Sequence, residues 1–200
     1  MNIICFDMEG VFTPEIWVNV AKKTGIDELK ITTRDEPDYD KLMMYRIGIL
    51  EQHGITLKYI QEVISSLDLL PGARNFMDWA REQSQVVVVT DSFVEFALPF
   101  IEKLGKPLVL CHNLITNSLG MISGYTLRQP DPKRRSVEAF QSLKYRIIAI
   151  GDSYNDISML LQAEQGILYR PPQNVKEEYP QLPVTTNYEE LKSEIIKAWS

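Results

Sequence analysis

The chain has 200 residues, of which 44% are hydrophobic, and a formal net charge of −6 at pH 7. This length suits one large domain, or one core with a smaller insert, and leaves ample apolar sequence for a real core. The negative charge disfavours nucleic acid or an anionic membrane as a partner, and no apolar run approaches the ~20 residues that span a bilayer.

The first expected element is a short apolar strand at residues 3–6, which runs directly into Asp7, Glu9 and Gly10. The two acids are two positions apart, so on extended chain they share a face, and the glycine lets the backbone turn away. Two carboxylates held this close repel each other, which favours a bound cation or a protonated partner. The pattern predicts a site for metal or acid–base chemistry.

Residues 12–70 have helical rather than alternating patterns. The three expected helices run from Thr13-Pro14, as cap and first turn, to Gly25, from Asp38 to His53, and from Thr56 to Leu67. Each carries apolar residues at helical spacing. We expect a small helical cap over the carboxyl edge of a sheet, inserted into a core made of residues 1–11 and 71–200.

From residue 86 to residue 169, short apolar strands alternate with helices. The expected strands are 86–89, 108–111, 121–127 as a hairpin arm, 147–150 and 166–169. Ser92 and Glu95 form an S-x-x-E capping box that predicts the start of one helix, which Gly105 would end, and further helices are expected near 135–143 and 157–163. After Pro171-Pro172 we expect a surface loop and a helix capped by Asn187. The alternation predicts an α/β fold with a doubly wound, mostly parallel, Rossmann-type sheet and a ligand site at the carboxyl ends of its strands.

Four groups of polar residues follow expected strands or begin the next helix. They are Asp7 with Glu9, the run Thr90-Asp91-Ser92, Lys133, and the string G-D-S-Y-N-D at residues 151–156. Each alone has an ordinary structural interpretation, such as a helix cap or a solvated charge. Together they supply a carboxylate nucleophile, a hydroxyl, a fixed cation and a second acidic cluster, which phosphoryl transfer through an aspartyl-phosphate requires.

These residues resemble the motifs of haloacid dehalogenase-superfamily phosphatases that carry a helical cap after the first motif. More narrowly, the chain resembles the phosphoserine phosphatases, and above all the bacterial phosphoserine:homoserine phosphotransferases, which perform both reactions. The likeness covers nearly the whole chain. It is carried by the strings D-M-E-G-V, P-E-I-W, K-T-G-I-D, T-T-R-D, P-D-Y-D, L-C-H, D-P-K-R and G-D-S-Y-N-D.

The resemblance implies Asp7 as the nucleophile and Glu9 as the general acid and base. It implies Mg²⁺ as cofactor, held by Asp7, the Glu9 backbone carbonyl and Asp152, with Asp156 in support. Thr90 and Lys133 would bind the phosphoryl group, with Asn155 nearby, and Asp91 is placed in the same group without a specific role. Glu15 would hold the ammonium group of phosphoserine and Arg46 its carboxylate, because these side chains suit those charges.

One residue departs from the superfamily pattern, since Glu9 stands where Asp is usual. The extra methylene moves the carboxyl group by about 1.5 Å. We hypothesise that Glu9 activates water less well, so that the aspartyl-phosphate survives until homoserine arrives as the acceptor.

Other functions stay open at this point. The chain could be a capped phosphatase for another small phosphate ester, a phospho-aspartate receiver module, or a catalytically silent binding protein. The first-strand position of Asp7 and the G-D-S-Y-N-D string disfavour the receiver module, and the presence of every expected catalytic residue disfavours the silent protein.

The remaining cysteine and histidine residues indicate core packing. Cys5 and Cys111 lie in apolar runs, which predicts small core residues and no disulfide framework, and His112 is expected in the core as well. The N-terminus lacks a signal-peptide pattern, so we expect a cytoplasmic protein. The expected partners are small-molecule substrates, and a homodimer is compatible with this reading.

Overall fold

Within residues 1–32, 35–36 and 38–199, which the computed structural model describes, seven strands form one sheet in the order β4-β3-β2-β1-β5-β6-β7. Neighbouring strands are parallel except for β3 and β4, which form an antiparallel hairpin. The strands are β1 (Asn2–Phe6), β2 (Gln85–Phe93), β3 (Leu108–Thr116), β4 (Ile122–Thr126), β5 (Arg146–Gly151), β6 (Gln165–Tyr169) and β7 (Val184–Thr185). The predicted α/β fold with a mostly parallel sheet is confirmed.

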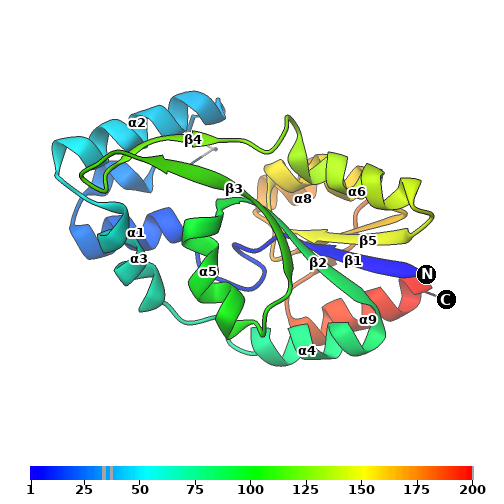
Figure 1. Ribbon diagram of the computed structural model, residues 1–200. Coiled ribbons are helices and arrows are strands. Elements are labelled where there is room, and N and C mark those ends of the chain that lie inside the picture. Colours follow the sequence, from blue (N-terminus) through cyan, green and yellow to red (C-terminus); the bar gives the residue numbers. More distant parts are fainter. Residues whose placement is uncertain (33–34, 37, 200) are drawn as a thin grey trace.

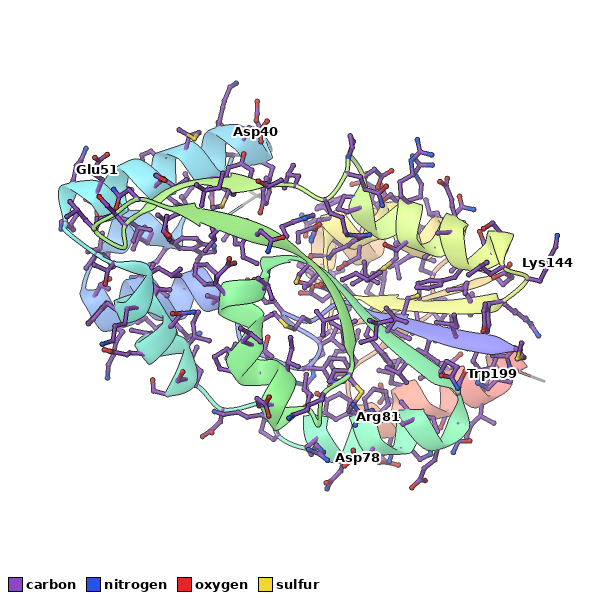
Figure 2. All side chains as sticks on the ribbon, viewed as in Figure 1. Asp40, Glu51, Asp78, Arg81, Lys144 and Trp199 are labelled. Atoms are coloured by element: carbon purple, nitrogen blue, oxygen red, sulfur yellow. The ribbon has the colours of Figure 1, made fainter. Side chains whose placement is uncertain are left out.

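Helices cover both faces of this sheet (Figure 1). The helices that precede β2 are α1 (Ile16–Thr24), the 3₁₀ turn η1 (Asp27–Lys30), α2 (Tyr39–Gln52), α3 (Leu57–Ser65) and α4 (Ala73–Gln83). All except α4 lie within residues 12–70. The helices that follow β2 are α5 (Val94–Lys103), α6 (Pro132–Ser142), the 3₁₀ turn η2 (Tyr154–Asp156), α7 (Ile157–Gln162), α8 (Gln173–Glu178) and α9 (Tyr188–Trp199). The charged side chains of Glu51 in α2 and of Lys144, in the turn after α6, point away from the rest of the molecule (Figure 2).

Successive side chains of β1 belong to two different hydrophobic cores, one on each face of the sheet. Ile4 and Phe6 belong to a core packed under α4, α5 and α9, whereas Ile3 and Cys5 belong to a second core under α6, α7 and α8. Successive strand residues point to opposite faces, so a continuous apolar run is what a strand covered on both sides needs. Cys5 is buried and Cys111 is half-buried, and both are free thiols, as predicted.

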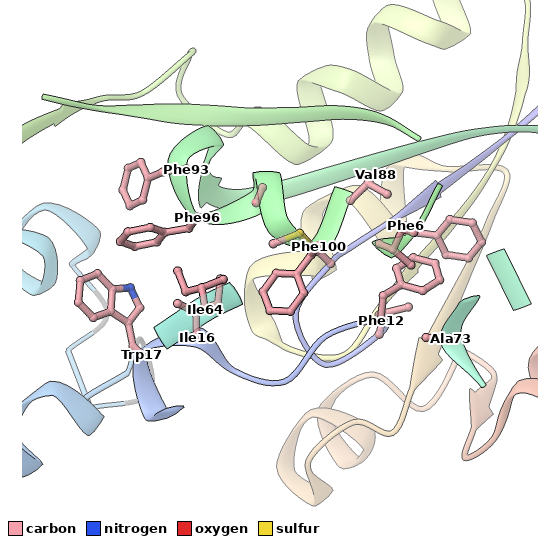
Figure 3. Packing of buried hydrophobic residues seen from close by; sticks show 14 of the residues in the cluster. Phe6, Phe12, Ile16, Trp17, Ile64, Ala73, Val88, Phe93, Phe96 and Phe100 are labelled. Carbon is pink, nitrogen blue, oxygen red and sulfur yellow. The ribbon is translucent and has the colours of Figure 1, made fainter. Parts of the chain in front are cut away.

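The first of these cores continues from the sheet into the helical segment. The Phe6 and Phe12 rings are 5.0 Å apart at their centroids, and farther along Phe96 lies 5.6 Å from Trp17 of α1 (Figure 3). Helices α1, α2 and α3 lie together beyond the ends of β1 and β2, and the β3–β4 hairpin reaches over to α2 (Figure 1). The Tyr125 hydroxyl of β4 hydrogen bonds to Asp40 there. The division into a core and a cap at residues 12–70 stays a prediction.

Two predicted helix starts are wrong, the first because β2 runs further than expected and the second because a distant side chain caps the helix. The strand β2 continues through Ser92, whose N–H donates to Thr90 Oγ1 at 3.2 Å, so α5 begins only at Val94 and no capping box forms. The Glu95 carboxylate instead accepts the Leu114 N–H at 3.1 Å. The helix expected from Thr13 begins at Ile16, because its first N–H is capped by the distant Glu9 carboxylate at 2.8 Å.

Some of the other predicted helix boundaries agree with the structure and some do not. Gly25 ends α1 with a positive φ of 74° and Asn187 caps α9, as predicted, and Thr56, where the third helix was expected to start, caps α3. The helix expected at 135–143 begins three residues earlier, at Pro132, and the loop expected after Pro171-Pro172 contains α8 and β7. The helices α4 and η1 were not predicted. Thr33, Arg34 and Pro37, from the T-T-R-D and P-D-Y-D strings, lie outside the described residues.

No membrane-spanning candidate occurs among the helices that the structure describes, because none combines the length and the apolar character that a span requires.

Candidate active site

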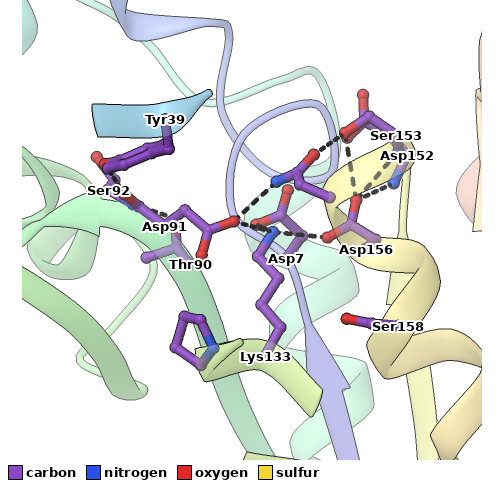
Figure 4. Close-up of polar contacts among 12 residues, drawn as sticks. Asp7, Tyr39, Thr90, Asp91, Ser92, Lys133, Asp152, Ser153, Asp156 and Ser158 are labelled. Atoms are coloured by element: carbon purple, nitrogen blue, oxygen red, sulfur yellow. Dashed lines mark hydrogen bonds and ion pairs between the residues drawn. The ribbon is translucent and has the colours of Figure 1, made fainter. Parts of the chain in front are cut away.

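Three buried carboxylates meet where β1 and β5 end. Asp7 follows β1 and its N–H donates to the Ile150 carbonyl of β5 at 2.8 Å, while Asp152 and Asp156 follow β5. Asp7, Asp152 and Asp156 each offer a carboxylate oxygen, and these oxygens lie within 4.8 Å of one another (Figure 4). Adjacent parallel strands end at the same edge of a sheet, which is why residues 145 positions apart converge.

Lys133 provides the cation of this cluster. It lies in the first turn of α6 after Pro132, and only 1% of its surface is exposed. Its Nζ is 2.6 Å from Asp156 Oδ1, 2.9 Å from Asp7 Oδ1 and 3.4 Å from Asp91 Oδ2. Burial alone would lower the pKa of Lys133, but the three acids outweigh it and hold the pKa well above its usual value. The ammonium group therefore stays charged.

The G-D-S-Y-N-D string folds into a turn that fixes Asp156. Asp156 Oδ2 accepts the N–H groups of Asp152 at 2.9 Å and Ser153 at 3.1 Å, and Oδ1 accepts Lys133. Gly151 permits this wrap, since a Cβ there would lie 2.3 Å from the Asp156 Cβ. Because both of its oxygens are already engaged, Asp156 is suited to support neighbouring ligands rather than to act alone.

The electrostatics of the cluster fit a divalent cation. Burial, followed by the charge of Asp156, raises the pKa of Asp7 well above its usual value, and the same causes raise the pKa of Asp152 to about 7. One lysine offsets three acids, so a bound cation would relieve the remaining repulsion. Carboxylate oxygens are the ligands that Mg²⁺ prefers, and the donor set therefore fits this ion.

The Glu9 carboxylate bonds to α1, whereas Asp7 contacts Lys133. The Glu9 side chain caps the first turn of α1, and burial, followed by the charge of Glu15, raises the pKa of Glu9 to about 8. The backbone turns directly after Glu9, where Gly10 adopts a φ of 76°. This turn packs closely against Asp152, since a Cβ on Gly10 would lie 2.5 Å from Asp152 Cγ. The backbone thus turns away after the acid pair, as the sequence predicts.

A cavity of about 230 Å³ opens above these acids. Eight of the ten predicted site residues line it: Asp7, Glu9, Glu15, Arg46, Thr90, Asp91, Asp152 and Asn155. The other two, Lys133 and Asp156, lie behind Asp7 in the buried cluster. The structure therefore brings all ten residues to one place, and their individual roles stay predictions.

Arg46 of α2 lines this cavity and is held in place by two contacts. Its guanidinium lies 4.5 Å from the centroid of the Trp17 ring, and Nη2 donates to the Ile31 carbonyl at 2.6 Å. Its buried Nε lacks a hydrogen-bond partner among the described residues. Burial lowers the pKa of Arg46 to about 10, so the group remains cationic at neutral pH. A cation with an unused donor beside the cavity suits a carboxylate ligand.

Comparison with protein families identifies the fold family from sequence. A family model described as haloacid dehalogenase-like hydrolase matches residues 1–164. The chain belongs to this family. The resemblance noted from the motifs is therefore confirmed at the level of the family.

Individual relatives of this hydrolase are named as phosphoserine phosphatases. The Pseudomonas aeruginosa protein named phosphoserine phosphatase ThrH is 55% identical over 200 residues, covering 100% of this chain and 98% of the relative. A Pseudomonas syringae pv. tomato phosphoserine phosphatase is 54% identical over 198 residues, covering 99% of this chain and 84% of the relative. A solved substrate-bound phosphoserine phosphatase complex shares the fold, with a TM-score of 0.80 at 18% identity and coverage of 96% and 97%.

Three residues beside the cavity of this hydrolase were not assigned to the site from sequence. Tyr39 of α2 donates its hydroxyl to the Asp91 carbonyl at 2.9 Å, and Trp17 lies under the Arg46 guanidinium. His112 of β3, expected in the core, is indeed buried but faces Asp91. Their sequence patterns are those of core aromatic residues, and only the P-D-Y-D string pointed toward Tyr39.

Proposed function

We propose that this hydrolase is a Mg²⁺-dependent phosphoserine phosphatase that also transfers the phosphoryl group to homoserine. The observation that carries the proposal is one cavity whose lining includes Asp7, which contacts Lys133, together with Glu15 and Arg46. Phosphoserine has a phosphoryl group at one end and an ammonium and a carboxylate at the other. Each of its charged groups therefore has a suitable partner among the residues that line the cavity.

In the first half-reaction, Asp7 attacks phosphorus and the bond to the serine oxygen breaks. Glu9 gives its proton to the leaving oxygen, so that serine departs as the alcohol and an aspartyl-phosphate remains. Lys133 and Thr90 neutralise the charge on the phosphoryl oxygens. Mg²⁺, held by Asp7 and Asp152 with the Glu9 carbonyl, would supply further charge stabilisation.

In the second half-reaction, Glu9 takes a proton from the acceptor, whose oxygen attacks phosphorus and releases Asp7. Water as acceptor gives inorganic phosphate. Homoserine as acceptor gives phosphohomoserine, and it carries the same ammonium and carboxylate as serine, so Glu15 and Arg46 would hold it in the same way. The relatives named phosphoserine phosphatase support the donor, and the homoserine step rests on this shared head group.

The placement of α1, α2 and α3 beyond the strand ends supports residues 12–70 as a cap. In this proposal the cap supplies Glu15 and Arg46, which select the amino-acid end of the substrate, while the core supplies the phosphoryl chemistry. Selection and catalysis would thus come from different parts of the chain.

The test incubates the protein with phosphoserine and Mg²⁺, with and without homoserine, and follows the products by phosphorus NMR. We expect inorganic phosphate in both reactions and phosphohomoserine only when homoserine is present. Formation of neither product would overturn the assignment, and phosphate without phosphohomoserine would remove the transferase part.

A matched variant distinguishes phosphoserine from another small phosphate ester as the substrate. Arg46→Met should raise KM for phosphoserine by roughly 10–150-fold, since a hydrogen bond to a charged group contributes about 1.5–3 kcal/mol. Phosphoethanolamine lacks the carboxylate, so its KM should not change. An equal effect on both esters would argue for a structural role of Arg46 and for a different substrate.

A further inference from the structure

Asp91 has a partly buried carboxylate, with 26% of its side chain exposed, that the chemistry above does not use. It lies in β2 directly after Thr90, and its Oδ2 accepts the Asn155 Nδ2 at 2.9 Å and lies 3.4 Å from Lys133 Nζ (Figure 4). Burial alone would raise the pKa of Asp91, but Lys133, His112 and Asn155 outweigh it and hold the pKa below its usual range. An ionised carboxylate is an acceptor only, so this side chain cannot donate to a phosphoryl oxygen.

His112 faces the other oxygen of the same carboxylate. It is 2% exposed, and its Nδ1 accepts the Arg128 N–H at 3.1 Å. Because Nδ1 is the acceptor, the ring proton of the neutral imidazole is on Nε2. Nε2 lies 3.9 Å from Asp91 Oδ1. The backbone of Arg128 therefore sets the tautomer that directs an N–H toward Asp91.

Asn155 and Lys133, which Asp91 contacts, are residues expected at the phosphoryl group. The Asn155 amide is held at both ends, since its Oδ1 accepts the Ser153 hydroxyl at 2.5 Å while one N–H goes to Asp91. The three Lys133 N–H bonds have Asp156, Asp7 and Asp91 as neighbours, with oxygens 2.6, 2.9 and 3.4 Å from Nζ. The N–H toward Asp91 makes the longest of these contacts and can be shared with a ligand, and the second Asn155 N–H can also donate to one.

Asp91 and Asn155 also line two cavities. Both residues line the cavity of about 230 Å³ above Asp7 and a second one of about 450 Å³ that His112 borders. Tyr39 lines both cavities too and donates to the Asp91 carbonyl. A side chain that lines two cavities needs polar contacts to keep it in place, and Asp91 supplies them for Asn155.

We propose that Asp91 is a positioning residue of the phosphoryl-transfer site, which orients the Asn155 amide and the Lys133 ammonium toward the phosphoryl group, and that His112 supports it from behind. This inference rests on the proposed function for its chemistry. In this role the Asp91 side chain does not contact the substrate.

Three variants separate this role from simple electrostatics. Asp91→Asn keeps the shape, but its amide must turn an N–H group toward either Asn155 and Lys133 or the N–H of His112, so two donors face each other. A change of tautomer would not help, because Nδ1–H would then oppose the Arg128 N–H. His112→Asn keeps an acceptor for Arg128 and removes the donor toward Asp91, whereas His112→Gln keeps that donor.

The first measurement is calorimetric binding of inorganic phosphate in the presence of Mg²⁺, which does not depend on which ester is the substrate. Removal of a negative charge near an anion should tighten phosphate binding by electrostatics alone. The positioning role predicts the opposite: binding roughly 10-fold weaker for Asp91→Asn and for His112→Asn, as for residues that orient ligands from an outer shell, with His112→Gln within about threefold of wild type. Tighter or unchanged phosphate binding by Asp91→Asn would overturn the proposal.

The second measurement is kcat on phosphoserine, together with inhibition by L-serine and the melting temperature. We expect kcat to fall by roughly 10–100-fold in Asp91→Asn with the inhibition constant of L-serine unchanged, because serine would be held by Glu15 and Arg46. A uniform loss of phosphate and serine affinity with a lower melting temperature would indicate a structural role instead. Absence of phosphoserine turnover by the wild type would overturn the proposed function, while the phosphate measurement would still decide the role of Asp91.

Discussion

The Glu9 carboxylate accepts the N–H of Ile16 at 2.8 Å, which ties the acid two residues after Asp7 to the first turn of α1. One side chain therefore serves two purposes: it faces the cavity and it fixes the start of the helix that follows Glu15. An aspartate at this position would be shorter by about 1.5 Å and could not reach Ile16 from the same backbone. The glutamate that departs from the superfamily pattern therefore makes a hydrogen bond that an aspartate could not make.

Glu9→Asp should shift the partition of the aspartyl-phosphate toward water. A carboxyl group released from Ile16 and closer to the strand end would activate water better, so less intermediate would survive until homoserine binds. The measurement is the ratio of inorganic phosphate to phosphohomoserine for wild type and variant at one homoserine concentration. An unchanged ratio would eliminate Glu9 as the cause of transfer.

Gly10→Ala should damage the metal site more than the fold. The added Cβ would meet Asp152 Cγ at 2.5 Å, and the φ of 76° is itself costly for alanine. Displacement of Asp152 by about 1 Å is expected to lower kcat by roughly 100-fold and to raise the Mg²⁺ concentration needed for half-maximal activity. Gly25→Ala is the control, because it has a similar φ of 74° with nothing near the added Cβ. Equal losses in both variants would show that backbone strain, and not Asp152, is responsible.

Mg²⁺ should stabilise the folded chain, since Asp7, Asp152 and Asp156 repel one another with one lysine among them. A ligand at 100 times its Kd adds about 2.7 kcal/mol to the free energy of unfolding. Thermal unfolding with Mg²⁺ and with a chelator measures this increment.

Asp152→Asn is the matched variant for the metal measurement. Loss of one charge relieves the repulsion, so the variant should melt at a higher temperature than wild type in the presence of chelator. It should gain little from added Mg²⁺. A full Mg²⁺ increment in Asp152→Asn would place the ion elsewhere.

Lys133→Met should abolish turnover and destabilise the fold. Removal of one partner from a buried ionic cluster typically costs about 3–5 kcal/mol, because the remaining charges lose their compensation. Urea unfolding and turnover of phosphoserine measure the two effects. The methionine variant keeps the packing of the aliphatic stem, so turnover near the wild-type rate would exclude a role of the ammonium at the phosphoryl group.

Much of this protein follows from its sequence alone. Short apolar runs next to Asp7, Thr90 and Asp152 predicted buried parallel strands, and parallel strands bring their carboxyl ends to one edge. Local signals such as Gly25, Thr56 and Asn187 also predicted helix ends correctly, since the atoms involved are only a few residues apart. Fold class and the gathering of Asp7, Thr90 and Asp152 are therefore properties of local pattern plus a general rule of topology, whereas Glu15 and Arg46 were placed by the family resemblance.

The tertiary structure alone decided which group meets which. Glu9 caps α1 across seven positions, Tyr39 reaches Asp91 across 52, and Arg128 sets the tautomer of His112 across 16. Such contacts depend on side-chain direction and on how α2 and the β3–β4 hairpin lie beside the sheet, which no periodicity in the chain encodes. For this reason the sequence determined the chemistry that gathers at the sheet edge, and the packing decided how Asp91, Asn155 and Lys133 are aimed.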